Sequence, residues 1–446
     1  MRGSAAFRTG VAPGGALAPG WVKNELWRRA RAVPSLDLRF AENKSLVDAT
    51  TGASLVTFTR ASSGTFVGSD GVLRTAVTNL VLRSEEFDNA SWSGAVAIIT
   101  ANVATAPNGT TTADRITGSG VSAAQSKTSS ALAAGQGSVA VSVYAKYESH
   151  KWLQLFFNGD GGPFANYDIE TGVVGSTGTN TTATIAPVGD GWYRCVCVKT
   201  AGNATDVTGC RIVLVDAGNS SRNANSATAA SLLLWGAQLE QSTTVGEYIP
   251  TTSVINSAPR FDHNPTTGES LGLLVEEART NYLLQSEDFS STWTNSNIAV
   301  TTNSVVAPNG TTTADTIAPP ADGLTVTRFL RQNPILTTQQ AYTLSVFVKV
   351  GTATTNGINL YVSDSTATNS FRANFNLFTL AASAGSTGWA TPTATIVPYP
   401  NGWYRCILTG VTSTVHVSLR AQIYLNVFGN TPDTYGSIHV WGAQLE

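Results

Sequence analysis

Residues 139–147 read Val-Ala-Val-Ser-Val-Tyr-Ala-Lys-Tyr, and every second position from Val139 to Ala145 is apolar. An alternation with period two is typical of a β-strand with one buried face. The alternation returns at residues 342–350, which read Tyr-Thr-Leu-Ser-Val-Phe-Val-Lys-Val. Several such stretches are separated by Gly, Asn and Asp turns, and no long stretch has helical period. The sequence therefore predicts an all-β chain built from antiparallel sandwiches.

Working outward from these two strands, four further landmarks occur twice and in the same order. The first set lies at residues 78–87, 106–114, 191–195 and 235–240, and the second at 280–289, 307–315, 402–406 and 441–446. The last landmark, Trp-Gly-Ala-Gln-Leu-Glu, is identical in both sets. A spacing of about 200 residues is too long for a solenoid repeat, so a whole domain is duplicated. We call the two copies the first and second cassettes.

The remaining segments frame the cassettes. We predict a flexible N-terminal arm with a short basic helix at residues 1–35 and a small β-rich adaptor segment at 36–78. The first sandwich module follows at 79–253. A connector at 254–280 completes the adaptor, and the second module occupies 281–446.

Composition limits the classes of function. Charged residues make up only 13% of the chain, against an average of about 25%, and the net charge is −2. Such a surface does not favour nucleic acid or an anionic membrane as partner. No run of 18 apolar residues predicts a membrane span, and residues 1–20 do not resemble a signal peptide.

The four cysteines lack the spacing of a zinc site. Cys195 and Cys406 occupy the same place in the two cassettes, and we expect them to be small buried side chains. Cys197 and Cys210 could meet as a disulfide, but two free thiols fit the pattern better.

Several stretches resemble phage and prophage virion proteins of the tail-fibre, head-fibre or spike-like type. They are Phe58-Thr59-Arg60-Ala61-Ser62, Pro259-Arg260-Phe261-Asp262, the run from Gly272 to Asn281, Gly402-Trp403-Tyr404-Arg405 and the final Trp441–Glu446. Those proteins carry jelly-roll domains similar to carbohydrate-binding modules. The resemblance implies two jelly-roll sandwiches in a virion part that acts outside the cell on a host-surface glycan. It also implies contact with other virion proteins through the N-terminal segment.

One departure from that family concerns domain order. In the family, the Phe-Thr-Arg-Ala-Ser stretch runs directly into the Pro-Arg-Phe-Asp stretch, whereas here the first cassette intervenes. We therefore predict that this cassette is inserted into an adaptor whose two parts, 36–78 and 254–280, pack against each other. The oligomeric state stays open: fibre-like proteins are often trimers, so a homo-oligomer is compatible, but no heptad run supports a coiled coil.

The chain carries no recognisable catalytic signature, and we expect it not to be an enzyme. Its four histidines, His150, His263, His416 and His439, do not recur between cassettes. The neighbouring acids Glu85-Glu86 and Glu276-Glu277 would point to opposite sides of a strand and are better explained as surface charge. No cofactor is expected. A structural calcium ion held by Glu85 with Glu240, or by Glu287 with Glu446, is the less favoured alternative to solvated acids.

Two structural expectations follow from comparing the cassettes. Asp114 recurs as Asp315, and Arg194 as Arg405, so each carboxylate could pair with the guanidinium of its own sandwich.

After Glu240 the first cassette continues through Tyr248, whereas the second stops at Glu446. We expect either a longer natural protein or a second sandwich without this strap, with an exposed apolar patch where Tyr248 would pack.

The ligand face is predicted from the outward positions of two successive strands. We expect the two strands to form a hairpin whose outer face presents aromatic rings beside amides and lysine, which suits sugars. The alternative is that an adaptor segment or another subunit covers this face. The outward residues are Ser142, Tyr144, Lys146, Trp152, Gln154 and Phe156 in the first cassette, and Ser345, Phe347, Lys349, Asn359 and Tyr361 in the second.

Two alternative functions remain at this point. The chain could be a pair of carbohydrate-binding modules from a secreted polysaccharide-degrading enzyme whose catalytic domain lies elsewhere. It could also be a capsid or tail decoration protein without a ligand.

Overall fold

A computed structural model describes residues 36–53, 55–94, 96–129, 138–200, 207–320, 326–336, 340–352, 357–412, 418–425 and 436–446. The arm predicted at residues 1–35 lies outside the described residues, as does His416. The chain divides into two compact units. The first-cassette unit holds residues 56–65 and 75–259, and the second-cassette unit holds the described residues up to Leu55, residues 66–74 and 260–446.

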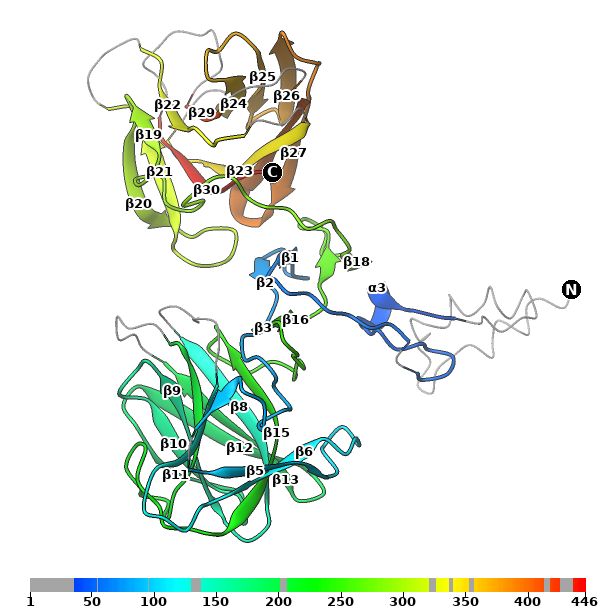
Figure 1. The fold of residues 1–446 in the computed structure, drawn as a ribbon. Coiled ribbons are helices and arrows are strands. Elements are labelled where there is room, and N and C mark those ends of the chain that lie inside the picture. The colour runs from blue at the N-terminus through cyan, green and yellow to red at the C-terminus, as the bar shows by residue number, and fades with distance from the viewer. Residues whose placement is uncertain are drawn as a thin grey trace, which may run out of the picture. The chain divides into compact units, whose positions relative to one another are not determined.

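The first cassette is a sandwich of two six-stranded antiparallel sheets, drawn in cyan and green in Figure 1. One sheet has the order β12-β13-β8-β15-β6-β5 and the other the order β11-β10-β9-β14-β7-β4. The strands are β4 (Trp92–Ser93), β5 (Ile98–Ala104), β6 (Ala113–Thr117), β7 (Gln125–Ser129), β8 (Val139–Tyr147), β9 (Trp152–Asn158), β10 (Phe164–Asp168), β11 (Val173–Thr177), β12 (Thr181–Gly189), β13 (Trp192–Lys199), β14 (Gly209–Leu214) and β15 (Ser231–Glu240).

The second cassette repeats this arrangement. Its sheets have the orders β20-β21-β30-β23-β28-β27 and β19-β22-β29-β24-β25-β26. The elements are β19 (Thr294–Ser296), β20 (Ala299–Val305), β21 (Ala314–Ala318), β22 (Phe329–Gln332), β23 (Ala341–Val350), β24 (Gly357–Asp364), β25 (Ser370–Asn376), β26 (Ala381–Thr387), β27 (Thr393–Tyr399), the 3₁₀ turn η1 (Pro400–Gly402), β28 (Trp403–Val411), β29 (Leu419–Tyr424) and β30 (Ile438–Leu445).

The path of the chain between the sheets is that of a jelly roll. Strands β6, β7, β8 and β9 alternate between the two sheets, and the last strand, β15, returns to lie between β6 and β8. The corresponding strands of the second cassette, β21 to β24 and β30, follow the same path. This double Greek-key connection confirms the prediction of two antiparallel jelly-roll sandwiches.

Each sandwich has a core of its own between its sheets. The inward residues of β8 and β9, including Val141 and Leu155, are fully or almost fully buried, and so are Val346 and Leu360 of the second cassette. The four cysteines are free and buried, and burial raises the pKa of each thiol. The expectation that Cys195 and Cys406 are buried apolar side chains is confirmed.

Asp114 and Asp315 do not pair with Arg194 and Arg405, so that expectation is wrong. Asp114 accepts backbone N–H bonds from Phe87 at 2.8 Å and from Asn102 at 2.9 Å. Asp315 accepts the equivalent bonds from Phe289 and Asn303 at the same two distances. Asn102 and Asn303 lie where the β5–β6 and β20–β21 registers shift. Each aspartate therefore links the backbone of a β-bulge to the backbone of an earlier loop, through one hydrogen bond to each.

The two parts of the adaptor contact each other within both units. In the first-cassette unit, β3 (Thr78–Asn79) pairs with β16 (Asn256–Ser257). In the second-cassette unit, Val67 N donates to Asp262 Oδ1 at 2.7 Å, and Val67 O lies 2.8 Å from His263 Nδ1. The adaptor is therefore shared between the two units and forms no body of its own. The insertion of the first cassette remains a prediction.

The other adaptor elements are short. They are α3 (Phe40–Asn43), the hairpin of β1 (Thr65–Val67) with β2 (Leu73–Thr75), and the hairpin of β17 (Phe261–His263) with β18 (Ser270–Leu273). Within the adaptor segment that was predicted to be β-rich, residues 55–60 are not a strand. None of the described helices has the length and apolar character needed to cross a membrane.

Candidate functional site

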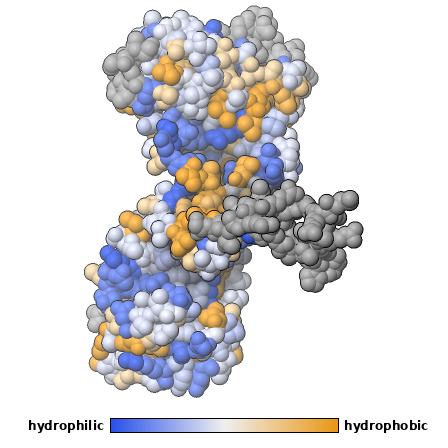
Figure 2. Space-filling model, turned by 90° about the vertical axis from the view of Figure 1, so that its right-hand side faces the viewer, coloured by the Kyte–Doolittle hydropathy of each residue, from blue (hydrophilic) through white to orange (hydrophobic). Residues whose placement is uncertain are grey.

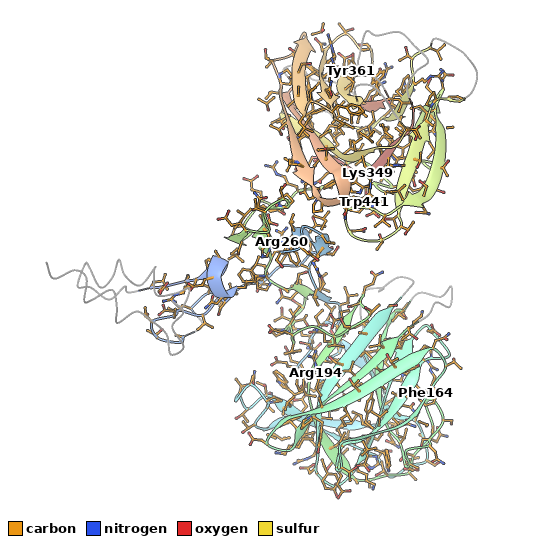
Figure 3. The ribbon with its side chains drawn as sticks, turned by 180° about the vertical axis from the view of Figure 1, so that it is seen from behind. Phe164, Arg194, Arg260, Lys349, Tyr361 and Trp441 are labelled. Carbon is orange, nitrogen blue, oxygen red and sulfur yellow. The ribbon has the colours of Figure 1, made fainter. Side chains whose placement is uncertain are left out.

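The predicted ligand-face residues do not lie on one surface. Strands β8 and β9 belong to opposite sheets of the first sandwich, and β23 and β24 belong to opposite sheets of the second. The expected hairpin is therefore wrong. A hairpin and a crossover from one sheet to the other both turn the same alternate residues toward the core, so the pattern alone could not distinguish them. In Figure 3, Tyr361 lies well apart from Lys349 and Trp441.

The outer face of the β8 sheet is covered by residues 245–252, which we call the strap. The ring of Tyr248 packs 4.6 Å from that of Trp235 and 5.9 Å from that of Tyr144. Arg194, labelled in Figure 3, donates to Gly246 O at 2.8 Å and to Ser142 Oγ at 3.1 Å. Ser142 is fully buried, and Tyr144 and Lys146 are half-buried.

The outer face of the β9 sheet is covered by residues 216–224. Gln154 is fully buried: its Nε2 donates to Asn166 Oδ1 at 2.7 Å and to Ser221 O at 3.0 Å. Its Oε1 accepts from Asn223 N at 2.6 Å. These bonds use the amide that was predicted to bind sugar.

The aromatic residues on this face are covered by the same segment. The Arg222 guanidinium lies 4.0 Å from the centre of the Phe156 ring. Trp152 is half-buried against Gly218, where a Cβ would come within 2.4 Å of the indole. Glycine at this position is therefore what allows the segment to lie flat on the tryptophan.

The second cassette buries its corresponding residues as well. Arg405 donates to Ser345 Oγ at 3.1 Å, and the Tyr399 ring lies 5.0 Å from that of Phe347. Lys349 is half-buried. On the opposite sheet, Asn359 Nδ2 donates to Asn374 Oδ1 at 2.6 Å, and the Tyr361 ring lies 5.9 Å from that of Tyr424.

The apolar patch expected in place of the strap is not exposed. Trp441 is 5% exposed, against 4% for Trp235 in the first cassette, and Phe347 is 4% exposed. Tyr399 and Leu73 pack against the cluster that contains both rings, and they replace the cover that Tyr248 gives in the first cassette. On the face shown in Figure 2, hydrophobic side chains form only small patches in a mainly hydrophilic or neutral surface.

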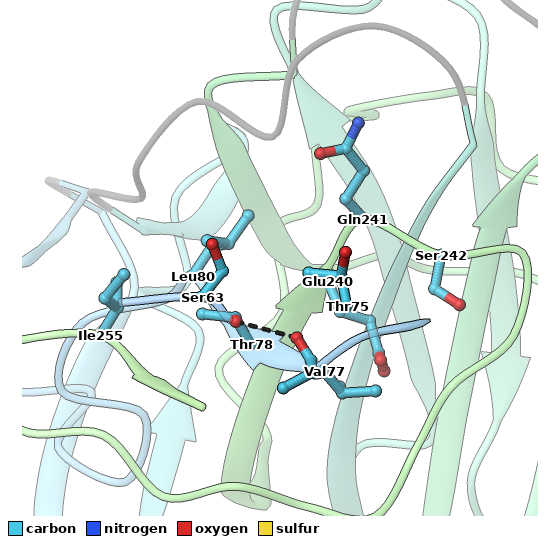
Figure 4. A pocket seen from close by; sticks show the side chains of 10 residues that line it. Ser63, Thr75, Val77, Thr78, Leu80, Glu240, Gln241, Ser242 and Ile255 are labelled. Carbon is cyan, nitrogen blue, oxygen red and sulfur yellow. Dashed lines mark hydrogen bonds between the residues drawn. The ribbon is translucent and has the colours of Figure 1, made fainter. Parts of the chain in front are cut away.

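A pocket of about 530 Å³ opens instead in the first-cassette unit, beside the strand that enters the sandwich. The side chains around it are shown in Figure 4. Its lining combines hydroxyl, amide and carboxylate groups with aliphatic side chains. The lining residues are Ser63, Thr75, Ala76, Val77, Thr78, Leu80, Glu240, Gln241, Ser242 and Ile255.

Glu240 is the acidic residue in the lining of this pocket. The residue is 2% exposed, and its Oε1 accepts from Gln238 Nε2 and from Gly246 N, each at 3.0 Å. Its buried Oε2 has no hydrogen-bond partner among the described residues. Burial raises the pKa of Glu240, and these two bonds together with the nearby charge of Arg194 oppose the rise.

The lining of the pocket matches the chemistry of a hydroxylated or cationic group. An unpartnered buried carboxylate oxygen favours a hydrogen-bond donor, because leaving it desolvated and unpaired is costly. The aliphatic wall of Val77, Leu80 and Ile255 suits C–H groups beside such a donor. Sequence reasoning noticed Glu240 only as a calcium candidate. The recurrence of Glu240 as Glu446 indicated that the position matters. The sequence pattern did not indicate that residues 75–80 lie beside residues 240–242.

No group of three or more His, Cys, Asp or Glu side chains among the described residues could hold a metal ion. The acids considered as catalytic pairs have other partners: Glu86 pairs with Arg83, Glu276 with Arg260 and Glu277 with Arg279. Glu85 accepts a hydrogen bond from the Tyr248 hydroxyl at 3.1 Å.

Comparison with known proteins gives only distant likenesses. No protein-family model matches the sequence, and no curated protein does. One similar solved structure is the enzymatically active domain of tailspike protein 4 from bacteriophage CBA120, with a TM-score of 0.24 and 13% identity over 37% of this chain. This chain spans 21% of that one.

A second similar structure is the tandem CBM22-1–CBM22-2 domain of Xyn10C from Paenibacillus barcinonensis. It has a TM-score of 0.27 and 13% identity, and the match covers 83% of this chain and 97% of that one. Likeness at this level says nothing about the function of this chain.

Proposed function

We propose that the chain is a non-enzymatic structural protein of a phage particle, and that the pocket of its first-cassette unit binds one unit of a host-surface glycan. The observation that carries the ligand is a pocket of about 530 Å³ whose lining sets the carboxylate of Glu240 and several hydroxyl groups beside aliphatic side chains. A sugar offers hydroxyl donors for this carboxylate and C–H groups for the aliphatic wall. Assignment to the particle rests on the resemblance carried by residues 58–62, 259–262 and 272–281.

A ligand-free structural role is the second candidate. It is favoured by the way the strap and residues 216–224 cover Tyr144, Trp235 and Phe156 on the two outer faces of the first sandwich. A pair of modules from a secreted enzyme would share the glycan site but would not be found in particles.

Binding of the full chain to an array of surface glycans and to host cells tests the proposal. Glu240→Gln should weaken glycan binding at least tenfold, because an amide supplies one acceptor and one donor where the carboxylate supplies two acceptors. Glu446→Gln, at the same place in the second cassette, is the matched control and should bind like the native chain. An unchanged melting temperature shows that both variants are folded.

Two results would decide against the proposal. If the native chain binds no glycan and no host cell, the ligand-free role is the better description. If the protein is absent from purified particles when their components are identified by mass spectrometry, the assignment to the virion is wrong.

A further inference from the structure

The turn before the Gly-Trp-Tyr-Arg-Cys landmark differs by one residue between the cassettes. The second cassette has Asn401-Gly402 between β27 and β28, and the first has Asp190-Gly191 between β12 and β13. Both residues of each pair have positive φ, 61° and 77° in the second cassette and 49° and 77° in the first. Asn-Gly and Asp-Gly are the dipeptides that hairpin turns of this kind prefer. The fold therefore accepts either an amide or a carboxylate at this position.

The chemistry of an Asn-Gly pair connects these two residue types. The backbone nitrogen of the glycine attacks Cγ of the asparagine, so that a new N–Cγ bond replaces the bond from Cγ to Nδ2. Ammonia leaves with Nδ2 and the proton of the glycine N–H, and a five-membered imide remains. Water then opens the imide, to aspartate if it attacks Cγ or to isoaspartate if it attacks the main-chain carbonyl. Glycine favours the first step because it has no Cβ to obstruct it.

Most of the other Asn-Gly pairs are held by side-chain hydrogen bonds. The sequence has five pairs, at residues 108–109, 158–159, 309–310, 356–357 and 401–402, and Asn356 lies outside the described residues. Asn108 Oδ1 accepts from Thr110 N at 3.0 Å and from Thr110 Oγ1 at 2.7 Å. Asn309 Oδ1 accepts the equivalent bonds from Thr311 at 3.0 and 2.6 Å. Closure of the imide has to displace each side-chain oxygen from its two donors.

Asn158 is restrained in a different way. It is the last residue of β9, where it pairs with Gly209 of β14, and its Nδ2 donates to Thr208 Oγ1 at 3.2 Å. An extended residue in a sheet cannot bring its Cγ onto the next backbone nitrogen without disturbing the strand pairing on that side. The fold therefore slows the reaction at this pair as well.

Asn401 differs from these three asparagines. Asn401 and Gly402 are both exposed, and the Asn401 side chain makes no hydrogen bond to any residue that the structure describes. We propose that Asn401 is a site of spontaneous modification, in which attack by Gly402 N releases ammonia and leaves aspartate or isoaspartate. The asparagines at 108, 158 and 309 are protected by the fold, although they precede glycine in the same way.

The two products have different structural consequences. Aspartate gives the second cassette the residue that the first already has as Asp190, and it adds one negative charge at an exposed turn. Isoaspartate instead lengthens the main chain of a turn that packs against the adaptor. Thr266 Oγ1 donates to Pro398 O at 3.4 Å, and a Cβ on Gly71 would clash with Pro400. We therefore expect the isoaspartate form to unfold at a lower temperature than the aspartate form.

Incubation of the folded full chain at alkaline pH in ¹⁸O-labelled water tests the proposal. Peptides from timed samples are analysed by mass spectrometry, which reports the rate at each asparagine and the uptake of one labelled oxygen from water. Asn401 should react about tenfold faster than Asn108 and Asn309, because each of those has hydrogen bonds to give up. Thr110→Val, which removes one donor to Asn108, should accelerate Asn108 and leave the rate at Asn401 unchanged.

The same incubation in urea separates the effect of the fold from that of the local sequence. In the unfolded chain no asparagine is held, so the rates at Asn401, Asn108 and Asn309 should converge. Equal rates in the folded chain, or a slower reaction at Asn401, would overturn the proposal. A difference that persists in urea would assign it to the neighbouring residues and not to the fold. The comparison uses asparagines of one chain, so it does not depend on whether a variant folds.

Discussion

Lys199 Nζ lies 2.8 Å from Asp160 Oδ2, and both side chains are fully buried in the first cassette. Lys199 follows Cys195 and Cys197 on the inward side of β13, so its charge is directed into the end of the core. The second cassette has Gly410 at this place, where a Cβ would lie 2.5 Å from the Phe371 ring. One copy of the domain thus closes the end of its core with an ion pair and the other with an aromatic ring.

Breaking this pair should destabilise only the first cassette. Asp160→Asn leaves the Lys199 ammonium buried without a counter-charge, at a cost of about 3–5 kcal/mol. Since each cassette has its own core, calorimetry should show a lower first-cassette transition and an unchanged second one. The double variant Asp160→Leu, Lys199→Met is the control and should restore stability, because replacing both charges by apolar groups is often neutral. A single variant as stable as the native chain would contradict the argument.

Asp114 and Asp315, which accept hydrogen bonds from the two β-bulges, allow the same test in each cassette. Asp114→Asn replaces one acceptor oxygen by an NH₂ group that faces a backbone N–H of Phe87 or Asn102. We expect a loss of about 1–3 kcal/mol in the first cassette. Asp315→Asn should cause a similar loss in the second cassette, where the two bonds are equivalent. Unequal losses, seen in urea unfolding of the two variants, would show that the two bulges are not equivalent.

The same two carboxyl groups predict a pH dependence. Burial raises the pKa of Asp114 from 3.8 to about 6 and raises that of Asp315, against the opposing backbone bonds. Between the unfolded and folded pKa values the native state binds more protons than the unfolded state. The free energy of unfolding therefore falls as pH rises from about 4 to 6. Urea titrations at intervals across this range check the sign, and a rise in stability over the same range would contradict it.

The sequence predicted the strands and their inward faces because burial imposes a period of two on each strand separately. Val141, Leu155 and Leu360 are inward-facing as expected. The pairing of strands was not predictable in the same way. Residues 148–151 join β8 to β9 across the two sheets, and a hairpin would have required no change in the alternation.

The segments that cover the outer faces, residues 245–252 and 216–224, could not be predicted from the residue pattern for a related reason. Gln154 and Trp152 have the composition of a sugar-binding surface, but Asn223 and Gly218, more than sixty residues later, occupy that surface. The pocket likewise joins Ser63, Glu240 and Ile255, which come together only through the sandwich. Repetition between cassettes was the informative signal: it identified Asp114 and Glu240 as positions with a role, although it did not reveal their partners.

Tyr248 carries the last prediction, because one side chain joins the strap to the sandwich through both its ring and its hydroxyl. The ring packs on Trp235 and Tyr144, and the hydroxyl lies 2.7 Å from Ser84 Oγ. Tyr248→Ala removes both contributions and should lower the stability of the first cassette by about 3–5 kcal/mol. Tyr248→Phe removes only the hydroxyl and should cost about 1 kcal/mol.

The corresponding change in the second cassette is Tyr399→Ala, since Tyr399 covers Phe347 there. It should lower only the second transition and leave the first unchanged. Tryptophan fluorescence gives an independent measurement: Tyr248→Ala uncovers Trp235, which is 4% exposed in the native fold, and should shift the emission to longer wavelength before any unfolding. If Tyr248→Ala left both the transition and the emission unchanged, the strap would be a passive cover, and its hydroxyl and ring contacts would contribute nothing to the stability of the sandwich.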